Sequence, residues 1–413
     1  MNLKCLGGFR EVGKNAVLVD TKKKIMFDYG IKVETGEPPL KTDKVDAIVL
    51  NHAHLDHVGS VPSLYKKQKP DIISTSTTFD LAHLIIKDSL KVARIRGMTK
   101  HFDKSDIEKM KKKEIMITYG QKYETEDYTM EFFNAGHIPG SFCCLLEIGG
   151  KRLFYTSDFN TNDSRLLKGA NIKVKDIDVL IMESTYSNRE HPPRKDTEKK
   201  FFEAVQDTIS NEGVAVIPSF AIGRAAEVLM VLDSFKHDFP IYLDGMARVA
   251  TELSLEHPEF IRDPKALKNA FRRVKVVESD LMRKKITKTP CAIVTTSGLL
   301  EGGPSVRYVK SLYNNVESSI IFTGFLIPKT AGRYLVDTGR FVTEGFDLKI
   351  KMGIEKMDFS AHTGRDGLFN FVNKMNPEKV ICMHGDYCER FASELRGRGF
   401  DAIAPVNGDV VNI

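Results

Sequence analysis

This chain of 413 residues is constrained most by one short segment, NHAHLDHVGS at Asn51–Ser60. The segment follows the apolar run DAIVL, which is typical of a buried strand, so its polar side chains begin where that strand ends. An extended backbone sends alternate side chains to one face, and His52 and His54 are therefore expected to point to one place. The next turn directs Asp56 and His57 to a neighbouring place. Imidazole with carboxylate is the ligand mixture of catalytic zinc, so the segment predicts metal binding.

Further polar residues of the ligand types stand just past other apolar, strand-like runs. These are His137 in NAGHIPGS, Asp158 in LFYTSDFN, Glu183 in DVLIMES, His362 in DFSAHTG and His384 in VICMHGD. Sites in α/β sheets are built at the ends of strands, and we therefore expect all five to join one site. Asp28 also ends a strand-like run, KIMFDYG, but we expect it to hold the ligand loop by hydrogen bonds. The histidines in helical or polar contexts are interpreted as surface or packing residues: His83, His101, His191, His237 and His257.

Short apolar runs alternate with helical patterns along the chain, which favours an α/β protein. The predicted strands are Lys24–Phe27, Ala47–Leu50, Arg152–Tyr155, Val179–Met182, Val214–Pro218, Ile241–Leu243, Ala292–Thr295, Ser319–Thr323 and Val380–Met383. The spacing predicts helices over Thr197–Ile209 and Gly223–Phe235. A polar stretch with two prolines at 188–200 indicates a passage between domains, and a second composition change lies near 345–356.

Composition excludes several classes of protein. Six cysteines without a Cys-x-x-Cys pair argue against a disulfide framework and indicate a reduced, cytoplasmic protein. The mean hydropathy is −0.24, and no apolar run approaches the roughly 18 residues that span a bilayer, so no membrane partner is expected. The net charge of +6 permits an anionic partner without requiring one.

The whole pattern resembles a known family. The order His-x-His-x-Asp-His, with a distant histidine and aspartate, is similar to the metallo-β-lactamase superfamily. Glu183, His362 and His384 resemble its β-CASP branch of nucleases, and the segments PSFAIGRAAEVL, TSGLLEGGPSVRYV and FTGFLIPKTAGRYL resemble the endonuclease subunit of the cleavage and polyadenylation specificity factor. The resemblance is to a short archaeal type without an added RNA-binding domain. It implies an αββα sandwich from residues 1–187 and 352–413, with an α/β β-CASP lobe inserted at 188–351.

The resemblance also implies a role for each ligand-type residue. Two zinc ions would be bound, with manganese as an alternative, since ligand type discriminates poorly between these ions. His52, His54 and His137 would hold the first ion, Asp158 would bridge, and Asp56, His57 and His384 would complete the second. His362 would be the general acid, oriented by Glu183, and Asp56 is placed with them among the catalytic residues.

Six residues are candidates for binding substrate: Ser297, Gly302, Gly303, Thr330 and Arg333, which belong to the insert, and Ser360, which follows it. Gly302 and Gly303 precede a predicted helix that has Pro304 in its first turn. The free amides at such a helix N-terminus attract phosphate.

The leading hypothesis is a zinc-dependent ribonuclease that cleaves single-stranded RNA. Endonuclease and 5′-to-3′ exonuclease action both stay open, as do a homodimer and partners from an RNA-processing complex. A DNA nuclease of the Artemis type is the alternative, although such relatives usually have valine where this chain has His384. Small-molecule hydrolases of the superfamily lack the insert and the Glu183 and His362 pair. Catalytically silent scaffold subunits have lost ligands, and none is missing here.

Overall fold

The computed structural model describes residues 1–42, 44–343 and 345–413. The chain divides into two compact units. The first unit comprises residues 1–163, 168–190 and 361–413, and the second comprises residues 164–167 and 191–360. The sequence places the domain boundaries at 187/188 and 351/352; the compact units change at 190/191 and 360/361, and residues 164–167 belong with the second unit.

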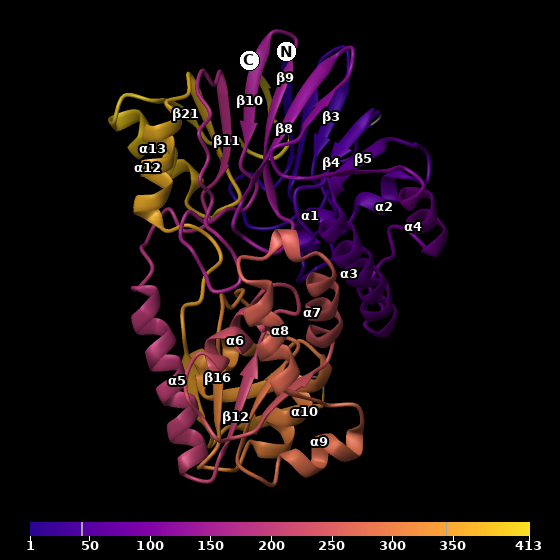
Figure 1. Ribbon diagram of the computed structural model, residues 1–413. Coiled ribbons are helices and arrows are strands. Elements are labelled where there is room, and N and C mark those ends of the chain that lie inside the picture. Colours follow the sequence, from indigo (N-terminus) through magenta and orange to yellow (C-terminus); the bar gives the residue numbers. More distant parts are fainter. Residues whose placement is uncertain (43, 344) are drawn as a thin grey trace. The chain divides into compact units, whose positions relative to one another are not determined.

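Two seven-stranded sheets form the centre of the first unit (Figure 1). The first sheet has, in spatial order, β22 (Val410–Asn412), β1 (Asn2–Gly7), β2 (Ala16–Asp20), β3 (Lys24–Phe27), β4 (Ala47–Val49), β5 (Asp71–Thr75) and β6 (Glu114–Ile117). The second sheet has β21 (Asp401–Ile403), β20 (Lys379–Met383), β11 (Val179–Glu183), β10 (Lys151–Tyr155), β9 (Phe142–Ile148), β8 (Tyr128–Asn134) and β7 (Lys122–Glu124). Because β1 pairs with β22, the two chain ends lie side by side.

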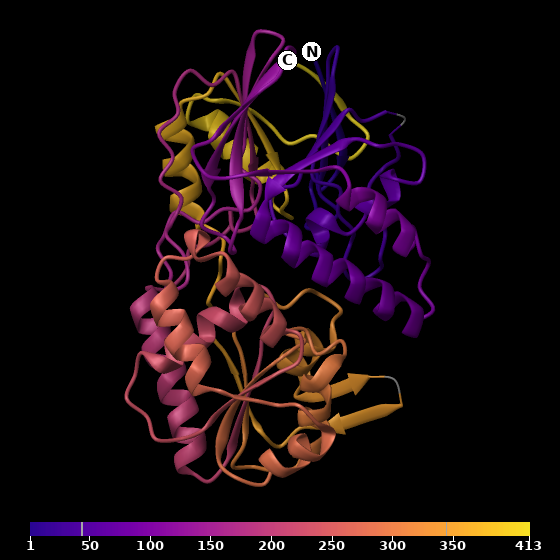
Figure 2. The same cartoon turned by 45° about the vertical axis from the view of Figure 1, so that its right-hand side comes forward.

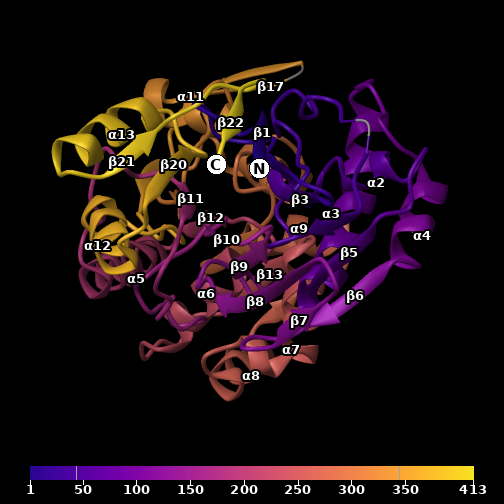
Figure 3. The same ribbon diagram turned by 90° about the horizontal axis from the view of Figure 1, so that it is seen from above.

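Helices cover the outer faces of these sheets, which gives the expected αββα layers (Figure 3). They are α1 (Leu55–Val58), α2 (Val61–Leu64), α3 (Ser76–Ile95) and α4 (Lys104–Lys111) on one side, and α12 (Arg365–Met375) and α13 (Cys388–Gly397) on the other. Because side chains alternate along a strand, one face of each sheet packs against the other sheet and the opposite face packs against the helices. In β9, Cys144 lies in the core between the sheets, whereas Cys143 packs in the core beneath α12 and α13.

The second unit is built on a parallel sheet of six strands. Their spatial order is β14 (Lys275–Val276), β13 (Ile241–Asp244), β15 (Cys291–Thr295), β12 (Val214–Pro218), β16 (Ser319–Phe322) and β19 (Gly353–Lys356). One face packs on α5 (Arg194–Ser210), α6 (Arg224–Asp233), α7 (Ala247–Glu256) and α8 (Pro264–Arg273). The other packs on α9 (Asp280–Ile286), α10 (Gly303–Leu312) and α11 (Ala331–Thr338). A 3₁₀ turn (Pro258–Phe260) and a hairpin of β17 (Arg340–Thr343) and β18 (Phe346–Lys349) complete the unit.

One expectation about local structure is wrong. His362 does not stand just past a strand, because β19 ends at Lys356 and the segment that leads to His362 is irregular. The histidine instead precedes α12, which begins at Arg365. The side chain of His362 is therefore positioned by an irregular loop before α12 and not by the end of a strand.

No helix in the described ranges combines the length and the apolar character needed to cross a bilayer.

Candidate metal centre

The ligand loop is fixed by hydrogen bonds from the residue that starts it. The amide of Asn51 donates to Asp28 Oδ1 at 3.0 Å, and its side-chain Nδ2 donates to the carbonyl of Phe142 at 2.8 Å. Asp28 follows β3 directly and is fully buried. The end of β4 is thus tied to strands of both sheets, which sets the direction in which His52 and His54 leave the strand.

The first ligand group consists of His52, His54, His137 and Asp158. Each offers one nitrogen or oxygen, and these atoms all lie within 4.8 Å of one another. His54 Nδ1 and His137 Nε2 are 3.1 Å apart, and His52 Nε2 lies 3.5 Å from Asp158 Oδ2. Nitrogen and oxygen atoms that bind one metal ion lie at such short distances from one another.

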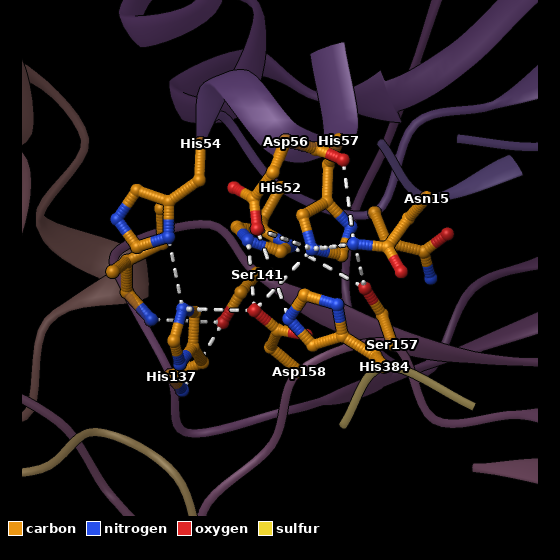
Figure 4. A network of polar contacts seen from close by, with 12 residues as sticks. Asn15, His52, His54, Asp56, His57, His137, Ser141, Ser157, Asp158 and His384 are labelled. Atoms are coloured by element: carbon orange, nitrogen blue, oxygen red, sulfur yellow. Dashed lines mark hydrogen bonds and ion pairs between the residues drawn. The ribbon is translucent and has the colours of Figure 1, made fainter. Parts of the chain in front are cut away.

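The second ligand group consists of Asp56, His57, Asp158 and His384, again within 4.8 Å of one another. His57 Nε2 lies 3.3 Å from Asp158 Oδ2, and His384 Nε2 lies 3.4 Å from Asp158 Oδ1. Figure 4 shows Asp158 between His54 and His137 on one side and His57 and His384 on the other. The carboxylate common to both groups is in the position of a bridging ligand.

Two buried atoms support metal occupancy independently of the geometry. His52 Nε2 and Asp158 Oδ1 are buried and have no hydrogen-bond partner in the described part of the chain. Such orphaned polar atoms are costly in a native fold, and a bound cation satisfies both. Nitrogen and carboxylate donors in these proportions suit zinc.

The electrostatics agree with this donor set. Burial lowers the pKa of His54 to about 4 and that of His137 well below its ordinary value, so both imidazoles are neutral, as ligands must be. Burial opposes the charge of Asp158, but His384 and His57 outweigh it and hold the pKa of the carboxyl well below its usual range. The site therefore presents neutral imidazoles of His54 and His137 beside an ionised carboxylate. Burial disfavours the charged form of His57 as well, but Asp158 and Asp28 outweigh it and raise the pKa of His57 well above its ordinary value.

A carboxylate and a phenol behind the centre orient His57. His57 Nδ1 lies 2.8 Å from Asp28 Oδ2, and Tyr155 donates its hydroxyl to the same oxygen at 3.0 Å. With Nδ1–H directed to Asp28, Nε2 faces Asp158 with its lone pair. His137 is held similarly, since its Nδ1 lies 2.9 Å from the carbonyl of Ala361. Asp28 makes the hydrogen bonds expected of it, whereas Tyr155 and the Ala361 carbonyl were not found from the sequence.

His362 and Glu183 form a pair beside the ligand groups. His362 Nδ1 lies 3.0 Å from Glu183 Oε1 and 2.8 Å from Oε2, and Oε1 also accepts from the amide of Phe159 at 2.8 Å. Glu183 is 2 % exposed. Burial disfavours the charged imidazole, but Glu183 and Asp158 together raise the pKa of His362 to about 9. Atoms of Asp158, Glu183 and His362 also lie within 4.8 Å of one another, so the pair adjoins the bridging carboxylate.

The candidates for substrate binding lie in the second unit. Ser297 follows β15, Gly302 is the residue before α10, and Gly303 begins that helix. Thr330 caps α11, and the amide of Gly332 donates to the Leu299 carbonyl at 2.9 Å, so the two glycine-containing segments adjoin. The Arg333 side chain is paired with Asp337 on its own helix at 2.7 Å. Ser360 donates its amide to Asp358 Oδ1 at 3.2 Å. Their role in RNA binding stays a prediction.

Comparison with known proteins identifies the family. A β-CASP domain model matches residues 225–335, a Zn-dependent metallo-hydrolase RNA specificity domain matches 347–405, and an anti-Pycsar protein Apyc1 model matches 8–191. A probable RNase of Methanocaldococcus jannaschii, named MJ4, is 36% identical over 98% of this chain and 99% of its own length. The chain belongs to the β-CASP branch of the metallo-β-lactamase superfamily. Membership in this branch makes the chain a metal-dependent hydrolase of the ribonuclease type.

Other β-CASP relatives cover the chain as fully. An RNase named aCSPSF2 from Saccharolobus solfataricus is 32% identical over the whole of this chain and 85% of its own. The transcription termination factor FttA of Pyrococcus abyssi is 34% identical over 99% of this chain and 70% of its own. A solved structure of a protein of unknown function from Enterococcus faecalis V583 has a TM-score of 0.62 over 99% of both chains at 15% identity, which shows the shared fold.

Proposed function

We propose that the chain is a zinc-dependent ribonuclease that hydrolyses phosphodiester bonds of single-stranded RNA at a two-ion centre. The observation that carries this proposal is the pair of four-residue ligand groups sharing Asp158, with the His362 and Glu183 pair beside them. Relatives that span the chain and are named RNases support RNA as the substrate class.

In this proposal each ligand group holds one ion. His52, His54 and His137 would bind the first, Asp56, His57 and His384 the second, and Asp158 would bridge them. Zinc bound there would supply Lewis-acid activation of water and neutralisation of phosphoryl charge. Manganese is an alternative occupant, because imidazole and carboxylate accept both ions.

His362 would give the proton that the departing ribose 3′-oxygen needs. Its Nδ1–H is directed to Glu183, whose carboxylate is itself held by the amide of Phe159. This arrangement fixes the ring and leaves Nε2 as the atom that carries the transferable proton. Glu183 touches the imidazole rather than the substrate, so its part is to orient His362 and to stabilise its charged form.

The position of cleavage and the assembly of the protein are open in this proposal. The same centre serves an endonuclease and a 5′-to-3′ exonuclease, and both are retained. Homodimer formation and partners from an RNA-processing complex also stay predictions. The alternative of an Artemis-type DNA nuclease has less support, because His384 joins the second ligand group and gives it a third side chain besides Asp158.

One experiment separates these functions by substrate and by metal. Labelled single-stranded RNA and DNA of the same sequence are incubated with the purified protein, with the chelated protein, and with the chelated protein after zinc is returned. We expect RNA cleavage that is lost with the metal and restored by zinc. Cleavage of DNA at an equal rate would favour the Artemis alternative, and RNA cleavage that persists without metal would contradict the proposal.

A further inference from the structure

The C-terminal part of α3, residues 87–95, has no fully buried residue and carries five exposed side chains: Lys87, Lys91, Val92, Arg94 and Ile95. Every buried residue of this 20-residue helix precedes Lys87. Beyond that point Val92 and Ile95 are 37% and 73% exposed. Figures 1 and 2 show this end of the purple helix projecting away from the sheets of its own unit. The projecting half does not serve the core, so it is free to contact another molecule.

The same region holds an excess of positive charge equal to that of the whole chain. Residues 87–113 contain ten lysines and arginines and four acidic residues, a net charge of +6. Three lysines in and just after α4 are ion-paired: Lys109 pairs with Asp106, Lys111 with Glu108, and Lys113 with Asp71. The cations on the projecting end of α3 therefore make up much of the charge that is left in this region, together with Lys100, Lys104 and Lys112.

Three cations of α3 form one positive face, Lys87, Lys91 and Arg94. Their spacings of four and three residues place them on one side of a helix. All three are exposed, and none has an ion pair with a carboxylate in the part of the chain that the structure describes. Unpaired cations repeated at each helical turn match the regular negative charge of a nucleic-acid backbone better than a single anion.

The helix links this face to the metal centre. Its first residue, Ser76, follows β5, and both Thr75 and Thr78 donate their hydroxyls to the carbonyl of Gly140, at 2.9 and 3.2 Å. Gly140 lies in the loop that carries the ligand His137. At about 1.5 Å per residue, Lys87 is roughly 17 Å and Arg94 roughly 27 Å along the helix from Ser76. An RNA strand at the metals reaches such positions with nucleotides several residues from the cleaved bond.

We propose that the face formed by Lys87, Lys91 and Arg94 is a second RNA-binding site, which holds the backbone of the substrate several nucleotides away from the scissile phosphate. This inference rests on the proposed ribonuclease function. Val92 and Ile95 offer apolar contact to sugars and bases beside the phosphates that the cations bind. The site lengthens the substrate that the enzyme recognises and has no part in the chemical step.

The test is the salt dependence of RNA binding. A fluorescent oligouridylate of about 20 nucleotides is titrated with the zinc-loaded protein between about 0.05 and 0.3 M salt, and anisotropy is measured. In the variant Lys87→Gln/Lys91→Gln/Arg94→Gln, we expect the slope of log K against log salt to fall by about 2, since each contact with single-stranded RNA contributes about 0.7. At about 0.1 M salt, binding should weaken by about 10- to 100-fold. Glutamine keeps helix propensity, so the fold is retained.

The matched control is Lys265→Gln/Lys268→Gln/Arg272→Gln on α8, which removes the same charges at spacings of three and four from another exposed helix. It should leave the slope unchanged. In cleavage assays the α3 variant should raise KM for the long RNA, leave KM for an RNA of about 5 nucleotides unchanged, and keep kcat for both.

The outcomes separate the two proposals. Equal behaviour of the α3 and α8 variants would overturn the second site while leaving the ribonuclease function intact. Salt-dependent binding that needs α3 but leads to no cleavage would retain the site and contradict the proposed function. Polyglutamate that competes with RNA as strongly as RNA itself would overturn RNA as the occupant in favour of an acidic protein.

Discussion

Asp158 is the residue on which the metal centre depends most. Both of its oxygens face imidazoles, and it is the one ligand common to both groups among the described residues. Asp158 is 2 % exposed, so solvent cannot reach the site to compensate for the loss of its negative charge. Without this carboxylate, each of the two ligand groups keeps three side chains, and no negative charge lies between the two metal positions.

We therefore expect Asp158→Ala to lower the amount of bound zinc. The remaining imidazoles of the two groups would no longer share an anion, and the attraction for two neighbouring cations is lost. Zinc per chain, measured by mass spectrometry of the purified variant, should fall well below that of the parent protein. Asp127→Ala is the control, because Asp127 pairs with surface lysines, and it should retain full zinc content. Unchanged zinc in Asp158→Ala would contradict the bridging role.

His362 is expected to act on the reaction and not on the metal. His362→Ala should keep the fold and the bound zinc but lower kcat by about 10²- to 10⁴-fold, the usual loss of a general acid. The change is measured under substrate saturation, with zinc determined on the same sample. A matched control is His83→Ala, which removes a histidine whose Nε2 lies 2.6 Å from Glu114 and leaves the site untouched. Full activity of His362→Ala would remove the proton-donor assignment.

The sequence predicts the metal-ligand residues better than it predicts the residues that hydrogen-bond to them and orient them. His52, His54, Asp56 and His57 are close in sequence, so their chemical types alone indicate a site. Tyr155 reaches Asp28 from another sheet, 127 positions away, and a tyrosine at a strand end carries no signal of that contact. Its buried hydroxyl is recognised only once the two sheets are packed.

Secondary-structure elements with continuous apolar runs agree closely with expectation. β3 and β12 have the predicted bounds, and most other predicted strands differ by one residue at an end. The β17–β18 hairpin was not found, because its exposed strands lack a buried apolar run. The segment 164–167 was also missed, since its place in the second unit comes from contacts distant in sequence.

Segment 164–167 is held by the carboxylates of Glu198 and Glu227, by Arg262, and by two leucines that enter the core. The amides of Arg165 and Leu166 donate to Glu227 of α6 at 3.1 and 2.7 Å. Leu166 is 1% exposed and belongs to the core between the sheet and helices α5–α8. The segment thus behaves as part of the second unit although the chain on both sides of it belongs to the first.

Leu166→Ala should destabilise this attachment. Loss of a buried leucine side chain costs about 2–5 kcal/mol, and the amide contacts with Glu227 are weakened at the same time. Limited trypsin digestion should then cut at Arg165 faster than in the parent protein, where its side chain pairs with Glu198, and the urea midpoint should fall. Leu281→Ala removes a leucine that is 79% exposed and should change neither measurement. Equal trypsin resistance of both variants would contradict this description of the segment.

Each of the two units has its own hydrophobic core and its own sheets. The first unit is assembled from three pieces of the chain, and this explains how His362 and His384 reach a centre begun by His52 more than 300 positions earlier. That His362 and His384 join the centre of His52 is predicted by the resemblance to the β-CASP family and not by the spacing of residues in the sequence. Alternation of strands and helices alone indicates an α/β fold and leaves the pairing of distant segments undetermined.

The proposed ribonuclease function can be tested on one RNA labelled at its 3′ end and prepared either with a 5′-monophosphate or with a blocked 5′ end. Zinc is determined on the same protein sample. We expect the zinc-loaded protein to cleave this RNA. Internal fragments from both RNAs would identify an endonuclease, and shortening of the unblocked RNA alone would identify a 5′-to-3′ exonuclease. If both RNAs stay intact in a sample that holds two zinc ions per chain, the protein is not a zinc-dependent ribonuclease of the proposed kind.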